Sequence, residues 1–126
     1  MLDDWLILTS AACLLLTSTL HAVGGEIYLL RPMFRHRGNR VLDNQLGRLV
    51  LRFAWHVTSL SWVMLAVILY GMVYAPGVLN QVILLSVGMG FLVIGLFDLV
   101  VSKGRHVGWP LLTLTGVFAL AALIYN

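Results

Sequence analysis

The sequence has little charge. Only 10% of its 126 residues are Asp, Glu, Lys or Arg, 60% are hydrophobic, and the mean hydropathy is +0.96. Soluble globular chains are about 25% charged and about 45–50% apolar, so this composition excludes an ordinary soluble domain. The net charge of +3 does not indicate nucleic-acid binding. The basic residues stand beside apolar segments, where they set topology and attract anionic lipid headgroups.

Motifs for catalysis and for metal binding are also scarce. Cys13 is the only cysteine, so the chain cannot form an intramolecular disulfide. There is no His-x-x-x-His, Cys-x-x-Cys or Glu-x-x-His spacing, no nucleophile elbow and no glycine-rich phosphate loop. Those patterns are typical of metal, hydrolase and nucleotide sites. No residue is assigned a catalytic role, and the sequence favours a function other than that of an enzyme.

Long apolar segments are abundant. A spanning helix needs about 20 mostly apolar residues, and four segments have about this length: 5–30, 49–74, 79–101 and 107–125. Short connections make consecutive helices antiparallel. The sequence predicts an all-α integral membrane protein, an antiparallel up-down bundle of four transmembrane helices in one domain over residues 1–126. Pro32 is expected to end the first helix, since the residue before a proline is disfavoured in helical geometry.

Positive charge is confined to two connections and the helix starts beside them. The basic residues are Arg31, Arg35, Arg37, Arg40, Arg48, Arg52, Lys103 and Arg105. The connection at 75–81 has no charge, and the N-terminus carries Asp3 and Asp4. Because short basic loops stay in the cytoplasm, both termini are expected outside, with the loop at 31–48 cytoplasmic, in a bacterial inner membrane. All the basic residues except Arg52 are expected to contact lipid headgroups or a partner.

Polar and small residues recur at helical spacing in three of the spans. Residues three or four positions apart lie on one face of a helix, so each set is expected to face protein. The first set is Ser10, Cys13, Thr17, His21, Gly24 and Tyr28. The second is Arg48, Arg52, His56 and Ser59 or Leu60, and the third is Gly88, Phe91, Gly95, Asp98 and Ser102.

Five ionisable residues fall inside or near the inner halves of the spans, and they form the candidate intramembrane site. They are His21, Glu26, Arg52, His56 and Asp98. Ionisable groups at membrane depth are costly and usually have named partners. Asp98 is expected to have a cationic or histidine partner, with Arg52 and His56 as the first candidates. Both His21 and His56 are expected to point into the protein. His36 and His106 lie in basic loops and are expected to be solvated or lipid-facing.

Three functional classes are compatible with this pattern. The first is a structural or accessory subunit, whose polar layer holds the helices together and whose partner is a second copy or another membrane subunit. The second is a proton- or cation-coupled carrier of small solutes. The third is a haem or metal protein that uses His21 and His56, because two histidines from neighbouring helices can coordinate haem.

The charge pattern makes a testable prediction about topology. A reporter fused after Asn126 should give an outside signal, and one inserted within residues 35–40 should give an inside signal, because every Lys and Arg then lies on the cytoplasmic side. Paired reporters that are active on opposite sides of the membrane measure this directly. A cytoplasmic C-terminus would contradict the four-span topology.

Overall fold

The computed structural model describes residues 2–125, and every regular element in that range is a helix. The elements are α1 (Leu2–Thr19), the π-helix η1 (Leu20–Leu30), α2 (Arg31–Arg35), α3 (Gln45–Tyr74), the 3-10 helix η2 (Pro76–Val78), α4 (Leu79–Ser102) and α5 (Trp109–Tyr125). Three segments are long and apolar enough to cross a membrane: Leu2–Arg35, Gln45–Tyr74 and Pro76–Ser102. A fourth apolar helix, Trp109–Ile124, is shorter.

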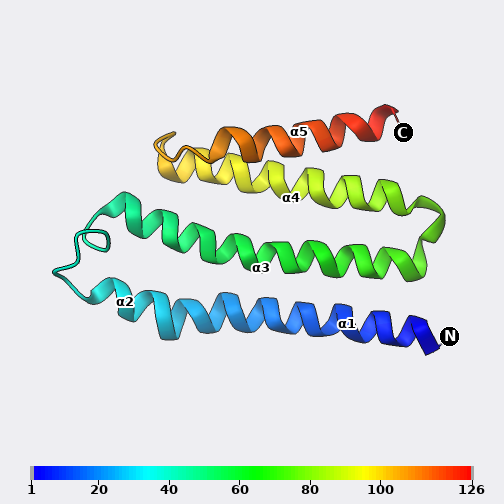
Figure 1. Cartoon of the computed structure of the whole chain (residues 1–126), viewed down its shortest axis with the longest axis horizontal. Helices are drawn as coiled ribbons and strands as arrows, with labels where there is room; N and C mark the ends of the chain where they lie inside the picture. Colours follow the sequence, from blue (N-terminus) through cyan, green and yellow to red (C-terminus); the bar gives the residue numbers. More distant parts are fainter. Residues whose placement is uncertain (1, 126) are drawn as a thin grey trace.

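The long helices lie side by side in an open row (Figure 1). α1 packs on α3, α3 on α4, and α4 on α5, whereas no other pair of these helices forms an extended interface within residues 2–125. This differs from a bundle in which the first and last helices would also meet. Both basic connections lie at one end of the row, and the two chain ends lie at the other (Figure 1).

The first helix does not end at Pro32, contrary to the expectation from the sequence. Arg31 has helical torsions, φ −62° and ψ −48°, and the helix continues through Pro32 to Arg35. Proline lacks an N–H and therefore disturbs a helix most where a regular hydrogen bond would have to form. Pro32 is the second residue of α2, which continues directly from the π-helix, so its missing donor falls at the change from π- to α-helical hydrogen bonding.

Polar side chains and turn geometry set the other helix ends. Asn44 caps α3, its side-chain oxygen accepting from the Leu46 N–H at 2.9 Å. α3 therefore begins at Gln45. At the end of α4, Lys103 adopts a left-handed conformation (φ 53°), and the Gly104 N–H reaches back to the Leu99 carbonyl at 2.9 Å. This turn folds the following loop back over α4.

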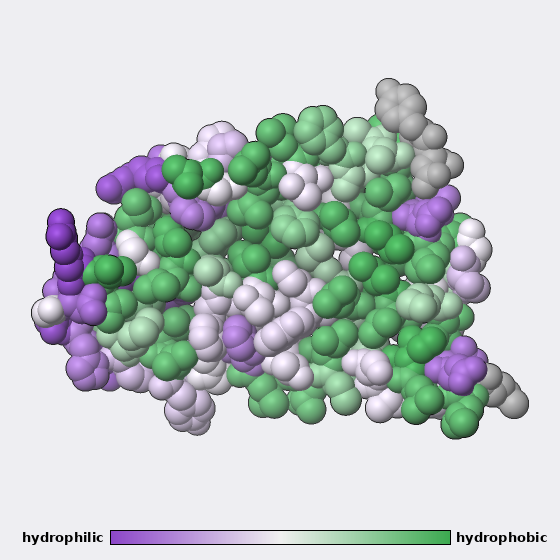
Figure 2. Space-filling view, viewed as in Figure 1, coloured by the Kyte–Doolittle hydropathy of each residue, from purple (hydrophilic) through white to green (hydrophobic). Residues whose placement is uncertain are grey.

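The outer surface of the row is largely apolar. Figure 2 shows hydrophobic residues over most of the visible face, with the hydrophilic residues concentrated at the two ends. Among the described residues, only five hydrophobic side chains are buried: Ala11, Leu30, Met64, Ala66 and Ile94. A surface of this kind needs an apolar environment, because large exposed apolar areas in water promote association. The structure therefore supports a membrane protein.

Glycines bring α4 and α5 into close contact. A Cβ on Gly95 would lie 2.5 Å from the backbone nitrogen of Thr113, and one on Gly116 would lie 2.4 Å from that of Leu92. Such contacts are with backbone atoms, which cannot turn aside as a side chain can. Small residues at helix contacts allow this approach, which drives packing between membrane helices.

Alanine at these positions should therefore separate the two helices. Gly95→Ala and Gly116→Ala should each destabilise the protein by about 1–3 kcal/mol, the usual cost of overpacking. Thermal unfolding of the purified protein in detergent measures the effect. Gly24→Ala is the matched control, because a Cβ at Gly24 meets nothing within 4 Å. Equal unfolding temperatures for all three variants would show that the α4–α5 contact is not close-packed.

Candidate functional site

A π-helix places the polar residues of the first helical segment in one column. In η1, backbone hydrogen bonds join residues five apart, and the Arg31 N–H donates to the Glu26 carbonyl. Residues five apart therefore lie toward the same side of the helix, as residues three or four apart do in an α-helix. His21, Glu26 and Arg31 share this spacing, and contacts of His21 and Glu26 with α3 confirm that both face that helix. π-Turns occur frequently at functional sites.

A tryptophan of α3 fits against the π-helix at a glycine. The Trp55 indole N–H donates to the His21 carbonyl at 2.9 Å. A Cβ on Gly25 would lie 2.2 Å from the same indole nitrogen, so this position can hold only glycine without moving the ring. The backbone of η1 and the side chain of α3 are thereby held in a fixed register at the level of the candidate site.

The His21 ring is enclosed by side chains of α3. It stacks on Trp55 with 4.1 Å between ring centroids, and it lies edge-on to Trp62 at 4.9 Å. Its Nδ1 shares a 2.9 Å hydrogen bond with the Ser59 hydroxyl. The backbone carbonyl of Ser59 accepts from the Ser18 hydroxyl at 2.8 Å. The imidazole therefore points into the protein, as expected, and its ring faces and Nδ1 are in contact with protein groups.

Glu26 is the centre of the charged part of the site. Its carboxylate oxygens lie 3.3 Å from Arg31 Nε, 3.0 Å from Arg52 Nη2 and 3.5 Å from His56 Nε2. Arg52 also donates through Nε at 3.1 Å, and its guanidinium lies over the Phe34 ring at 5.2 Å from the centroid. The Glu26 side chain is 19% exposed. A carboxylate with this many donors can stay ionised in a poorly solvated place, and it ties η1 and α2 to α3.

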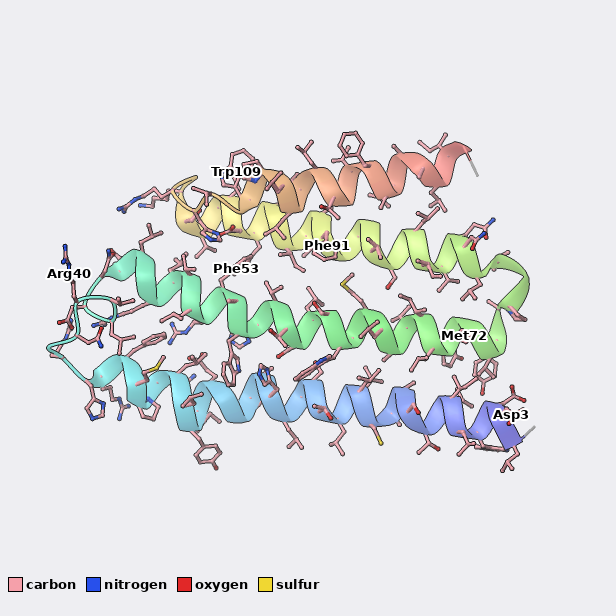
Figure 3. All side chains as sticks on the ribbon, viewed as in Figure 1. Asp3, Arg40, Phe53, Met72, Phe91 and Trp109 are labelled. Atoms are coloured by element: carbon pink, nitrogen blue, oxygen red, sulfur yellow. The ribbon has the colours of Figure 1, made fainter. Side chains whose placement is uncertain are left out.

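Asp98 belongs to a second, separate pair. It is completely buried, and its Oδ2 lies 2.5 Å from the Nδ1 of His106. The expectation of a cationic or histidine partner is confirmed, but the partner is His106 and not Arg52 or His56. The expectation of a solvated or lipid-facing His106 is wrong. The turn at the end of α4 returns His106 over that helix, and Phe53 of α3 covers the imidazole edge-on at 6.0 Å. Phe53 extends from α3 toward α4 (Figure 3).

The remaining basic residues differ in their contacts and in their exposure. Arg48 donates to the Leu42 carbonyl, and its Nη2 lies 3.6 Å from Asp43 Oδ1. That Nη2 is buried but has no hydrogen bond. The others of the expected headgroup set, apart from Arg31, are exposed in or beside the two loops: Arg35, Arg37, Arg40, Lys103 and Arg105.

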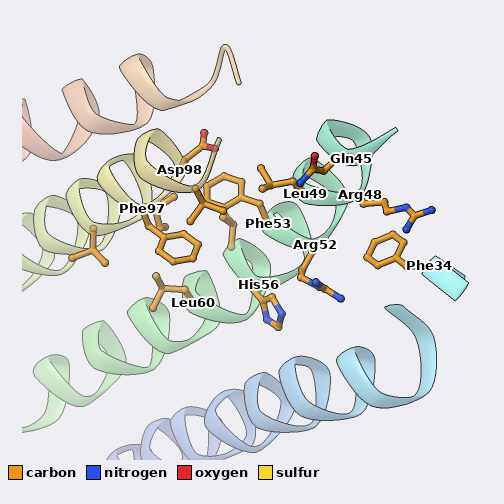
Figure 4. Close-up of a pocket in the computed structure, with 14 residues that line it drawn as sticks. Phe34, Gln45, Arg48, Leu49, Arg52, Phe53, His56, Leu60, Phe97 and Asp98 are labelled. Carbon is orange, nitrogen blue, oxygen red and sulfur yellow. The ribbon is translucent and has the colours of Figure 1, made fainter. Parts of the chain in front are cut away.

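A cavity of about 540 Å³ lies beside the charged group, mainly between α3 and α4. Arg48, Arg52 and His56 line it from α3, and Phe34 lines it from α2. Its other wall is mostly apolar and belongs to α4, including Phe97 (Figure 4). His56 therefore contacts the Glu26 carboxylate and also lines the cavity.

The face assigned to the first span is largely wrong. Ser10, Cys13, Thr17 and Tyr28 are exposed, whereas Ala11 and Ser18 on the neighbouring face are buried. The hydroxyl of Ser10 donates to the Leu6 carbonyl of its own helix at 3.0 Å. A serine or threonine that bonds four residues back needs no partner on another helix, so its polarity does not show which face meets protein.

Several important residues have no distinctive sequence signal. Trp55 and Trp62 read as ordinary aromatic residues of a membrane helix, and Ser18 as a small packing residue. Their contacts depend on the π-helix, which changes the direction in which the side chains after Leu20 point. A sequence pattern with the α-helical period of 3.6 residues does not reveal a π-helix. His106 is missed because its contact with Asp98 spans a helix end, where periodicity no longer applies.

Within residues 2–125, no three His, Cys, Asp or Glu side chains come together as a group that could hold a metal ion. Comparison of the chain with known protein families, with curated proteins and with solved structures finds no match.

The Asp98–His106 pair can be tested by removing one partner. His106→Ala leaves a fully buried carboxylate without its hydrogen bond and should destabilise the protein by about 3–5 kcal/mol. Asp98→Asn combined with His106→Ala should cost less than the sum of the two single changes, because both remove the same interaction. Thermal unfolding in detergent reports all three. His36→Ala, at an exposed loop histidine, is the control, and additive effects of Asp98→Asn and His106→Ala would refute the pairing.

Proposed function

We propose that the chain is a four-span protein of the bacterial inner membrane, with antiparallel helices, both termini outside and the basic loops in the cytoplasm. Three long apolar helices and the shorter apolar α5 support this topology. α5 has 17 residues, which corresponds to about 25 Å of helix and approaches the thickness of the hydrocarbon core. The two basic connections lie at the same end of the row (Figure 1), as a cytoplasmic position of both requires.

Within that membrane we propose a structural or accessory role. The observation that carries it is the Glu26 carboxylate, which contacts donors from α2 and α3 at once. The neighbouring His21 is likewise held by Ser59, Trp55 and Trp62. Groups engaged in this way hold helices in a fixed register, because polar contacts inside a membrane have no water to replace them.

The open row supports an accessory subunit that works beside another membrane protein or a second copy of itself. α1 and α5 each pack on only one long helix of the row, so their outer faces are available. Large apolar side chains, among them Leu16 of α1 and Phe118 of α5, are exposed on these helices, and van der Waals packing joins membrane helices.

A second function, proton- or cation-coupled transport, is favoured by one observation. His56 contacts Glu26 and also lines the cavity, with 42% of its side chain exposed. A histidine placed between a carboxylate and a cavity can pass a proton between them, because its two ring nitrogens can donate and accept a proton.

One experiment separates the two roles. Glu26→Ala leaves Arg31, Arg52 and His56 without their shared acceptor. It should destabilise the protein by about 1–3 kcal/mol, and Glu26→Gln should restore part of the loss by keeping hydrogen bonds. Folded yield and thermal unfolding measure stability, and proton flux into liposomes measures transport. Asp3→Ala, which removes an exposed carboxylate in the first turn of α1, is the control.

The structural role predicts that stability falls for Glu26→Ala and for His56→Ala and that no pH-dependent flux separates from it. Full stability of either variant, together with the loss of a flux that the unmodified protein shows, would contradict the structural role and establish the carrier.

A further inference from the structure

The cavity between α3 and α4 is polar at one end and apolar along its length. Gln45 and Arg48 line it near the start of α3, and Leu60 lines it four turns further along the helix. The apolar wall includes Phe53, Val93 and Phe97 (Figure 4). From Gln45 to Leu60 is about 22 Å along a helix. A site of this shape matches a molecule with a charged head and a long apolar chain.

Two guanidinium groups, those of Arg48 and Arg52, line the polar end of the cavity. Arg52 is already paired with Glu26, and Asp98, which also lines the cavity, is paired with His106. Arg48 is the residue with unused capacity, because its buried Nη2 makes no hydrogen bond and its contact with Asp43 is 3.6 Å long. An anion at this end would meet an unpaired donor.

We propose that this cavity binds one anionic phospholipid, with the phosphate at Arg48 and one acyl chain along the apolar wall between α3 and α4. This inference rests on the proposed membrane location but not on the structural role of Glu26. Arginine binds phosphate through charge-assisted hydrogen bonds, and basic pockets between membrane helices are typical sites for anionic headgroups. A free phosphate would leave Leu60, Val93 and Phe97 without a partner.

The direct test is lipid binding to the purified full chain in detergent, measured by native mass spectrometry. Phosphatidylglycerol and phosphatidylcholine with identical acyl chains are titrated in parallel. One phosphatidylglycerol should bind per chain, about tenfold more tightly than phosphatidylcholine, because both headgroups carry the phosphate but the choline cation of phosphatidylcholine is repelled by Arg48 and Arg52. Equal binding of the two lipids would overturn the proposal. Equally tight binding of inorganic phosphate alone would also overturn the proposal, because the apolar wall would then have no role.

Two pairs of variants locate the site. Arg48→Gln should weaken phosphatidylglycerol binding about tenfold, while Arg40→Gln, which removes the same charge from an exposed loop position, should leave it unchanged. Val93→Trp fills the groove and should abolish the one-lipid complex. Val107→Trp is its control, because Val107 is 87% exposed and does not line the cavity.

Equal effects within either pair would place the lipid elsewhere and refute the proposal. If Arg48→Gln does not fold, the tryptophan pair decides the result. Neither Arg48 nor Val93 contacts Glu26 in the charged group, so a failure here is distinguishable from a failure of the Glu26→Ala test.

Discussion

The carboxylate of Glu26 is the interaction on which the first half of the molecule depends. It meets a guanidinium from its own helical segment and a guanidinium and an imidazole from α3. In a low-dielectric environment an unpaired charge is costly, and a single ion pair often does not recover the cost of leaving water. Several donors around one carboxylate recover more of the cost of leaving water than a single ion pair does. The same contact fixes the rotation of η1 and so determines where His21 meets Trp55 and Ser59.

The π-helix makes this contact geometrically available. With α-helical spacing, residues five apart would project to different sides, and His21 and Glu26 could not both face α3. The wider turn aligns them with Arg31, and Gly25 leaves room for the Trp55 ring. The local backbone and the side-chain chemistry therefore depend on each other.

The sequence predicts the helical class and much of the polar site, but with uneven success. The third span shows why it can work: Gly88, Gly95, Asp98 and Ser102 are all buried on one face, because α4 is a regular helix with a small, close-packed side. In the first span, hydroxyls that bond to their own helix mimic a protein-facing stripe, and the π-helix changes the facing of every later residue. The pairing of Asp98 with His106 requires the left-handed turn at Lys103. A lysine at this position gives no sequence signal for a left-handed torsion.

The open row also has a consequence for how the chain assembles. Within residues 2–125, each long helix forms an extended interface only with the helix before it and the helix after it along the chain. No span has to wait for a distant one before it finds its neighbour, so the helices can dock in the order in which they are synthesised. Contacts between sequence neighbours close short loops and form quickly. A nascent chain that has inserted only α1 and α3 already contains the complete Glu26 group, before α4 exists.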